Sequence, residues 1–501
     1  MYRQWKRFLR QRAGRLAGTC AVWLCMAAAS LAQEAGGAVE SADALPTLHV
    51  WFEGKFSKGM EHYLNGRMRL TDTDGRAVEL PARFKTRGAT AQAYQMKPSF
   101  NMKLRTEDYA EEADSALLGL RSMSSWILDA MAIDRICMRN RVAFDVWNAF
   151  SRLPYDTDFG GRNGTEGRFV EVWINDVYHG IYCLSDRINR KLLGLKKVKV
   201  DKDGTATLRG LLYKNGTGDI ANQEEPGYND DFTACTVEWH NAWELTYPDD
   251  YACEAAWRPL QEAFADGTAA CVKRYFFLEN LADYQILVMA LSLGDSWGNK
   301  NRYLSVRNVE NDINDPRAEV ADGRRFVLTP WDMDASLGGN SRGSYYQGNY
   351  SHWAVKDIPK TAPFPIAPVI NDKEYVALLR QAWERGRVDA LAPEAVNARL
   401  DAYAALFLRS GAWQRQTKHF DAQRYRPNYV EDLAGEIEGV KQWYALRFEE
   451  MDRYFGITNG TYDVRTARES GTVYSLQGIP MGGRPLPRGV YIQSGRKVIA
   501  P

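Results

Sequence analysis

Two aspartates that directly follow an apolar strand signal are the feature that most restricts how this chain can fold. The run 326–328 (Phe-Val-Leu) predicts a buried strand, and Pro330 ends it because proline has no N–H for the ladder. Asp332 and Asp334 come next, ahead of a Gly-Gly loop. If this segment is extended, residues i and i+2 point the same way, so both carboxylates converge on one hard cation. The alternative is that one aspartate caps a turn and the other is solvated.

A second polar loop lies upstream, between an apolar helix and another strand. The stretch 275–293 is mostly apolar and predicts a helix, and its two internal acidic residues favour a core helix over a membrane span. Asp295 and Asn301 follow in a loop, and 302–306 predicts the next strand. A loop held between a buried helix and a strand places polar side chains on a rigid support, which is common in catalytic sites.

The N-terminal part of the chain is rich in strand signals. Arg87 and Gly88 begin a loop that can offer backbone N–H groups to an anion. Lys103 shares a strand face with Ser99 and Asn101, and the alternative for it is an ordinary solvated lysine. The predicted strands are 48–52, 67–70, 78–80, 99–104, 168–174 and 177–184, with a helix at 134–150.

These parts occur in the order found in protein kinases. A lysine on an N-terminal strand can hold polyphosphate, a later Asp-to-Asn loop can supply a base and a metal ligand, and an Asp after a strand can hold a cation. Most of the catalysis in phosphoryl transfer is positioning and charge neutralisation, which these side chains can provide. The sequence therefore points to a kinase-like site.

Several blocks of the sequence resemble the CotH kinase family, which is named for a spore-coat protein kinase. The blocks, in the family's order, are 97–104, 126–129, 138–145, 173–182, 295–303 and 330–334. The resemblance implies an α+β, atypical protein-kinase-like fold that uses ATP and a divalent metal, Mg or Mn. The domain divisions we expect are a mostly antiparallel, β-rich N-terminal lobe at 48–190, an elaboration at 191–270 and a mainly helical lobe at 271–456.

The resemblance also implies roles for individual residues. Lys103 matches the phosphate-anchoring lysine, with the Arg87-Gly88 loop as a further candidate on the phosphate side. Asp295 matches the catalytic aspartate. The metal ligands implied are Asn301, Asp332 and Asp334, and which aspartate of the pair is the main ligand stays open.

The chain departs from the kinase pattern in two respects. The usual spacing from the catalytic Asp to the metal-binding Asn falls on Lys300, so Asn299 and Asn301 both remain candidates. The helix that begins near residue 138 has no obvious Glu to pair with the lysine. Either Asp145 or Asp186 replaces that Glu, or the lysine is unpaired.

The N-terminus has the pattern of an export signal. Six basic residues precede the apolar stretch 16–29, and the small-x-small site 30–32 follows, which predicts a signal peptide cleaved near Ala32. An uncleaved anchor is the alternative. The segment 33–47 is expected to be a linker, and the mature chain is expected to lack a transmembrane helix. The protein is then secreted or held in the cell envelope.

The net charge bears on whether the protein binds nucleic acid, and the cysteine content on whether it forms disulfide bonds. The formal net charge of +1 gives no case for a nucleic acid partner. Five cysteines remain after the signal, without metal-site spacing, so that they form at most two disulfides or serve as buried free thiols. They are Cys137, Cys183, Cys235, Cys253 and Cys271.

The tail, 457–501, is separate from the domain. Strand signals at 473–478 and 489–492 flank a Pro- and Gly-rich turn, and 498–499 closes the chain. The tail resembles the C-terminal segments of secreted Bacteroidota proteins, which implies a sorting signal. The alternative is a β-hairpin packed on the domain.

Three functions are compatible with these observations. The first is a secreted kinase that transfers a phosphoryl group from ATP to Ser or Thr of an exported or surface protein. The second is a non-catalytic, kinase-like scaffold or binding module, since ATP is scarce outside the cytoplasm. The third uses the same ATP site for another transfer, such as nucleotidylation.

Overall fold

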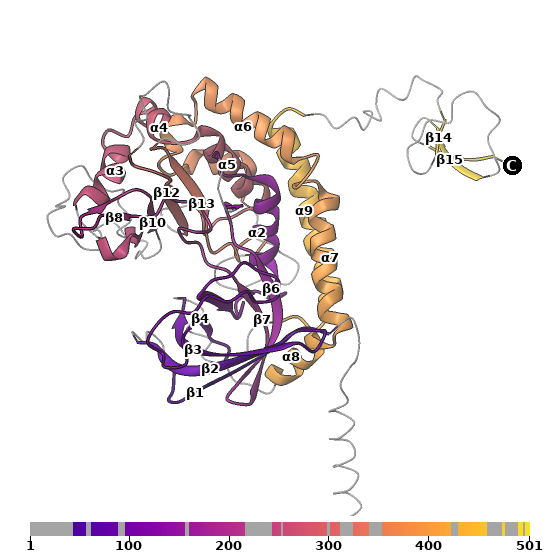
Figure 1. Ribbon diagram of the computed structural model, residues 1–501. Helices are drawn as coiled ribbons and strands as arrows, with labels where there is room; N and C mark the ends of the chain where they lie inside the picture. Colours follow the sequence, from indigo (N-terminus) through magenta and orange to yellow (C-terminus); the bar gives the residue numbers. More distant parts are fainter. Residues whose placement is uncertain are drawn as a thin grey trace, which may run out of the picture.

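A computed structural model provides the structure of the protein. It describes residues 44–56, 62–88, 96–155, 160–215, 243–251, 254–297, 301–310, 324–339, 353–421, 429–457, 473–475, 489–493 and 496–500. A β lobe and a mainly helical lobe lie one above the other in Figure 1, and α2 runs upward from their junction. The α+β architecture, with a β-rich N-terminal part and a mainly helical part after it, is confirmed.

The β lobe is a closed seven-stranded barrel with the strand order β1-β2-β3-β4-β5-β7-β6. The strands are β1 (Thr47–Phe52), β2 (Leu64–Thr71), β3 (Ala77–Arg87), β4 (Ser99–Leu104), β5 (Ser125–Asp129), β6 (Gly167–Ile174) and β7 (Val177–Ser185). Neighbours are antiparallel except β1 and β6, whose parallel pairing closes the barrel. Alternate residues such as Phe100, Met102 and Leu104 fill the interior, so the residues between them face outward.

The second lobe is built on a buried helix and a four-stranded sheet of order β11-β10-β12-β13. Its sheet consists of β10 (Leu211–Asn215), β11 (Trp243–Tyr247), β12 (Arg302–Val306) and β13 (Phe326–Pro330). The predicted elaboration therefore supplies β10 and β11, and β10 pairs directly with β12. The short strands β8 (Lys199–Val200) and β9 (Ala206–Thr207) form a separate pair.

Helices cover this sheet and extend down the side of the barrel (Figure 1). They are α2 (Arg139–Phe150), α3 (Glu254–Phe264), α4 (Ala269–Tyr275), α5 (Leu278–Leu291), α6 (Lys373–Gly386), α7 (Pro393–Arg409), α8 (Ala412–Asp421) and α9 (Leu433–Tyr454), with 3-10 turns η4 (Asp249–Tyr251), η6 (Val355–Thr361) and η7 (Ala367–Val369). The α5 helix is buried on nearly every side, as its apolar sequence predicts. Gln416 of α8 accepts a hydrogen bond from the Ile181 N–H of β7, which links the helices to the barrel.

One local prediction is wrong and another differs only in its bounds. The helix predicted at 275–293 is present as α5, which begins three residues later, while Phe276 is extended and forms a β-bridge with Phe326. The segment after β13 is not an extended strand, since Asp332 adopts left-handed backbone with φ 55°. The alternation argument for Asp332 and Asp334 therefore does not describe this segment.

The remaining predictions concern the thiols, the tail and the N-terminus. Cys137, Cys183 and Cys271 are buried free thiols, whereas Cys235 and Cys253 lie outside the described residues. The tail contains a three-stranded antiparallel sheet of β14 (Val473–Ser475), β15 (Gly489–Gln493) and β16 (Arg496–Ala500), drawn apart from the two lobes in Figure 1. The signal peptide and the linker up to residue 43 lie outside the described residues. In the described part of the chain, no helix has the length and apolarity needed to cross a membrane.

Candidate functional site

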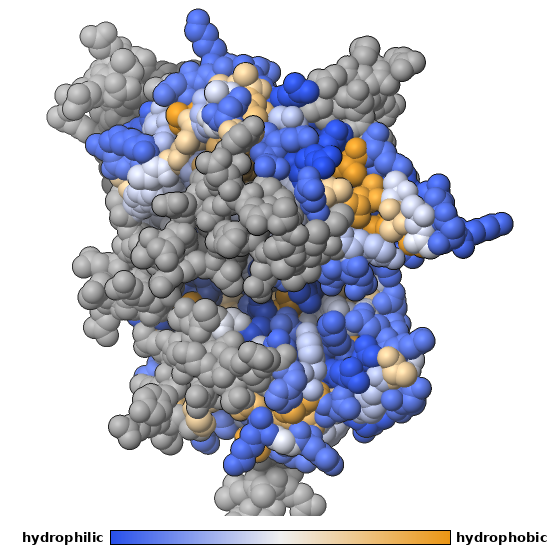
Figure 2. Space-filling view, turned by 90° about the vertical axis from the view of Figure 1, so that its left-hand side faces the viewer, coloured by the Kyte–Doolittle hydropathy of each residue, from blue (hydrophilic) through white to orange (hydrophobic). Residues whose placement is uncertain are grey.

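A pocket opens at the junction of the two lobes. Its volume is about 420 Å³, counting the space at its open mouth. Figure 2 views this junction from the left-hand side of Figure 1 and shows mainly hydrophilic surface there, with a small apolar area set deeper. The lining includes Arg87, Asp129, Asn140, Arg141, Trp331 and Asp332. The barrel, α2 and the stretch after β13 thus all contribute to one site.

The barrel presents an outward-facing row of polar side chains to this pocket. Arg87 of β3 is paired with Ser99 of β4, and the Ser99 hydroxyl donates a hydrogen bond of 3.2 Å to Asp129 Oδ1 of β5. Asp129 in turn is paired with Cys183 of β7. Because successive residues of a strand face opposite sides, this row lies outside the barrel core and against the second lobe.

Asn140 connects Asp129 to the aspartate pair. Its Nδ2 donates a 3.1 Å hydrogen bond to Asp129 Oδ2, and its Oδ1 accepts the Met333 N–H at 3.1 Å. Asn140 lies in the first turn of α2, so this helix fixes the barrel carboxylate and the Asp332–Asp334 backbone relative to each other.

Side chains on both sides of β13 hold the aspartate-bearing stretch in place. Asn280 of α5 accepts the Leu328 N–H at 2.7 Å and donates to the Leu328 carbonyl at 3.0 Å. Asn163 also donates to that carbonyl and accepts from the Thr329 hydroxyl. The strand that precedes Asp332 is therefore anchored by buried side-chain hydrogen bonds as well as by pairing with β12.

Left-handed backbone is concentrated around the site. Such conformations cost energy for non-glycine residues and cluster at functional sites. Six residues close in sequence to the acidic side chains have φ between 51° and 59°: Met131, Cys137, Ser292, Asn301, Asp332 and Leu337. Two of them, Asn301 and Asp332, are predicted metal ligands.

Asp295 and Asn301 also meet at the site. Asn301 Nδ2 donates a 2.9 Å hydrogen bond to Asp295 Oδ2, and the Asn301 carbonyl accepts the Trp331 N–H at 2.9 Å. The first contact joins the two ends of the polar loop, and the second joins that loop to the stretch after β13. Asn299 lies outside the described residues.

Asp334 lies in a concentration of negative charge. The pKa of Asp334 is well above its usual range. Burial of the carboxyl group raises it most, followed by the negative charges of Asp332, Asp129, Asp134 and Asp295. The structure thus brings the predicted residues Asp295, Asn301, Asp332 and Asp334 together, although the chain turns at Asp332.

The donor atoms of this group fit a hard divalent cation. Carboxylate and amide oxygens are the ligands that Mg and Mn prefer, and a cation there would relieve the repulsion that raises the pKa of Asp334. In the described ranges, no three His, Cys, Asp or Glu side chains form a ready-made metal cluster. A metal held here would therefore take Asn301 or other oxygen ligands beside the two aspartates.

The predicted phosphate-side residues are divided between two places. Arg87 lines the pocket, and its guanidinium lies 5.3 Å from the centre of the Trp331 ring. Gly88 follows it with φ 85°, a conformation suited to glycine. Lys103 is on the same outer barrel face but four residues from Ser99, about 13 Å along the strand. Lys103 Nζ lies 3.3 Å from Glu112 Oε1.

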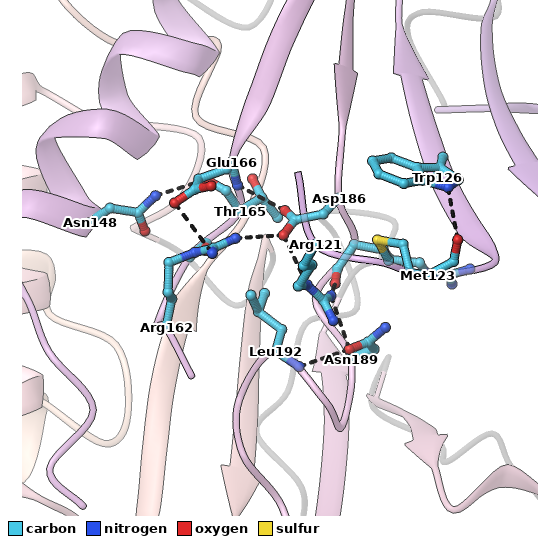
Figure 3. A network of polar contacts seen from close by, with 12 residues as sticks. Arg121, Met123, Trp126, Asn148, Arg162, Thr165, Glu166, Asp186, Asn189 and Leu192 are labelled. Atoms are coloured by element: carbon cyan, nitrogen blue, oxygen red, sulfur yellow. Dashed lines mark hydrogen bonds and ion pairs between the residues drawn. The ribbon is translucent and has the colours of Figure 1, made fainter. Parts of the chain in front are cut away.

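Neither aspartate considered as the partner of Lys103 is in contact with it. Asp145 accepts from Arg141 and from the Tyr403 hydroxyl. Asp186 is fully buried between Arg121 and Arg162, at 3.1 and 2.6 Å (Figure 3). Glu112, which comes from the loop after β4, provides the acidic partner of Lys103 instead.

Sequence reasoning missed several residues of the site. Asp129, Asn140 and Arg141 lie within the blocks that carry the family resemblance, but no role was assigned to them. Lys97 is buried behind the site and donates hydrogen bonds to Gln416 Oε1 and the Tyr429 hydroxyl, at 2.8 and 2.7 Å. Burial lowers the pKa of Lys97 to about 8.

The comparisons with known proteins identify a family for this chain. The family model described as CotH kinase protein matches residues 84–451, which include the barrel from β3 onward and nearly all of the second lobe. The comparison with the curated proteins gives no match. The family match covers more than half of the chain and contains every site residue described above. The chain therefore belongs to the CotH kinase protein family.

Proposed function

We propose that this protein is a secreted, ATP-dependent kinase that phosphorylates Ser or Thr side chains of exported or surface proteins. The observation that carries the proposal is the meeting of Asp295, Asn301 and the Asp332–Asp334 stretch beside a pocket that Arg87 also lines. A base, metal ligands and a phosphate-side cation are the groups that phosphoryl transfer requires. The N-terminal export signal supports the location outside the cytoplasm.

Each group has a role in this proposal. Asp295 orients the acceptor hydroxyl and accepts its proton as the hydroxyl oxygen attacks the γ-phosphorus, and ADP leaves. Asp332, Asp334 and Asn301 would hold Mg or Mn, which neutralises charge on the phosphate oxygens when bound. Arg87, the Gly88 loop and Lys103 are the proposed phosphate-side groups, with Lys103 held by Glu112. The two lobes position these groups, and positioning and charge stabilisation supply most of the catalysis of phosphoryl transfer.

The direct test is incubation of the purified protein with Mg or Mn and γ-labelled ATP. We expect label on the protein itself or on proteins of a cell-envelope extract, and none when EDTA is present. Intact-mass analysis of the products then identifies the transferred group, because a phosphoryl and a nucleotidyl group differ in mass. Absence of both transfer and ATP binding in a folded sample would contradict the proposal.

A non-catalytic scaffold is the second candidate. In its favour, the N-terminal export signal would take the protein out of the cytoplasm, to a location where ATP is scarce. On this view the kinase-like fold binds a surface partner, and Asp334→Asn leaves the biological role intact. Loss of that role in the variant would favour the kinase.

A further inference from the structure

The helix α2 presents an arginine to the pocket where a kinase would offer a glutamate. Arg141 lies in the first turn of the helix and lines the same pocket as Arg87, Asp129 and Asp332. Its side chain is almost fully buried in the protein. A second cation therefore lies beside the acidic groups, on a rigid helix.

Two contacts fix the guanidinium of Arg141. Its Nε donates a 2.9 Å hydrogen bond to Asp145 Oδ1, one turn along α2, and its Nη2 donates a 2.7 Å hydrogen bond to the Thr165 carbonyl. The Tyr403 hydroxyl donates to the other oxygen of Asp145 at 2.6 Å. These bonds use Nε and Nη2, and within the described part of the chain Nη1 makes no hydrogen bond, so it is the nitrogen left to bind a ligand in the pocket that Arg141 lines.

A buried ionic network holds the backbone that Arg141 contacts. Asp186 Oδ1 accepts the Glu166 N–H at 2.8 Å, directly after Thr165, while its other oxygen pairs with Arg121 and Arg162 (Figure 3). Asn148 Nδ2 also donates to the Thr165 carbonyl, at 2.8 Å. The carbonyl that orients Arg141 is thus held by Asn148 of α2, and the peptide after it by Asp186, which follows β7.

The charge of Arg141 persists in this environment. Burial acts to lower the pKa of its guanidinium, but Asp145, and after it Cys183 and Tyr403, outweigh that effect and raise the pKa. Guanidinium groups with one free N–H edge are well suited to phosphate oxygens. Lys103, by comparison, forms an ion pair with Glu112 on the outer face of the barrel.

We propose that Arg141 binds phosphate oxygens of the nucleotide in the pocket that it lines together with Asp129 and Asp332. This inference rests on the proposed function, and it adds a phosphate-binding residue to the site. Arg87 comes from the barrel and Arg141 from α2, so two cations and the carboxylate of Asp332 line the same pocket.

The test compares the affinities of ATP and adenosine by titration calorimetry with Mg, for the wild-type protein and Arg141→Met. We expect ATP to bind the variant about 10- to 100-fold more weakly, because one charge-assisted hydrogen bond is lost. Adenosine has no phosphates, so its affinity should not change. The matched control is Arg168→Met, at an exposed arginine whose Nη1 donates to the carbonyl of its neighbour Gly167.

Arg141→Lys provides the second variant if Arg141→Met does not fold. Lysine keeps the charge but cannot make both contacts of the guanidinium, so we expect ATP affinity to fall several-fold and adenosine affinity to stay unchanged. Unchanged ATP affinity, or an equal loss for ATP and adenosine, would overturn the inference while leaving the kinase proposal standing. A wild-type protein that does not bind ATP would overturn both.

Discussion

Replacing Asp334 with Asn is expected to reduce phosphoryl transfer by about 10²- to 10³-fold, the usual cost of removing one group that stabilises transition-state charge. Burial, and after it the carboxylates of Asp332, Asp129, Asp134 and Asp295, raise the pKa of Asp334, so this side chain is central to the acidic group. Asparagine keeps the shape of the side chain but lacks the negative charge that a divalent metal requires. The rate is measured with γ-labelled ATP at saturating Mg.

The same substitution should stabilise the protein in EDTA. Because the pKa of Asp334 is higher in the folded chain than its usual 3.8, the folded state binds more protons, and the contribution of Asp334 to stability falls as the pH rises above 3.8. The melting temperature of Asp334→Asn should therefore exceed that of the wild-type protein by a margin that grows toward neutral pH. Asp203→Asn, in an exposed turn, is the control and should change neither rate nor stability. A variant with full activity would exclude Asp334 from the site.

Asp134→Ala is expected to lower the free energy of unfolding by about 3–5 kcal/mol, the typical cost of breaking a buried ion pair. Asp134 Oδ1 lies 2.7 Å from Arg139 Nη1, and both side chains are buried. The same carboxylate accepts the backbone N–H groups of Ile136, Met138 and Arg139, which lead into α2. Urea unfolding at neutral pH measures the loss.

The control for this prediction is a substitution in an exposed ion pair of similar length. Asp74 and Arg76 are 2.6 Å apart but exposed, and exposed pairs contribute little because water screens them. Asp74→Ala should leave the unfolding transition where it is. Equal effects of the two substitutions would show that Asp134 does not anchor the start of α2.

Local sequence signals predicted elements of both lobes. The strands at 99–104 and 302–306 have the predicted bounds, and the helix predicted at 134–150 ends at Phe150 as expected but begins only at Arg139. Asn175 and Asp176 both adopt positive φ in the tight turn between β6 and β7, which these residue types tolerate. Periodicity and turn chemistry act within a few residues, so a sequence displays them directly.

The features that the sequence did not predict depend on contacts between distant residues. The helix α5 begins three residues later than predicted, and Phe276 before it forms a β-bridge with Phe326, fifty residues later. The strand β10 belongs to the central sheet of the second lobe because it pairs with β12, which a sequence reading of 191–270 could not show. Local propensity yields to such tertiary pairing.

The sequence predicted those site residues that lie together in short motifs. Asp295, Asn301, Asp332 and Asp334 were identified from two short motifs and are brought together. Asp129, Asn140 and Arg141 were not, because their contribution depends on the pairing of β4 with β5 and on the docking of α2. The role of Lys103 stays a prediction, and its partner Glu112 became visible only in the fold.

The measurement that tests the central claim most directly is the thermal unfolding of the purified protein with ATP, in Mg and in EDTA. A ligand that binds only the folded state raises its stability, by about 2.7 kcal/mol at a concentration 100 times its dissociation constant. The account predicts a rise in melting temperature with ATP that requires Mg, because the nucleotide and metal meet at the acidic group. An unchanged melting temperature at millimolar ATP and Mg, in a well-folded sample, would contradict a nucleotide site at the junction of the lobes.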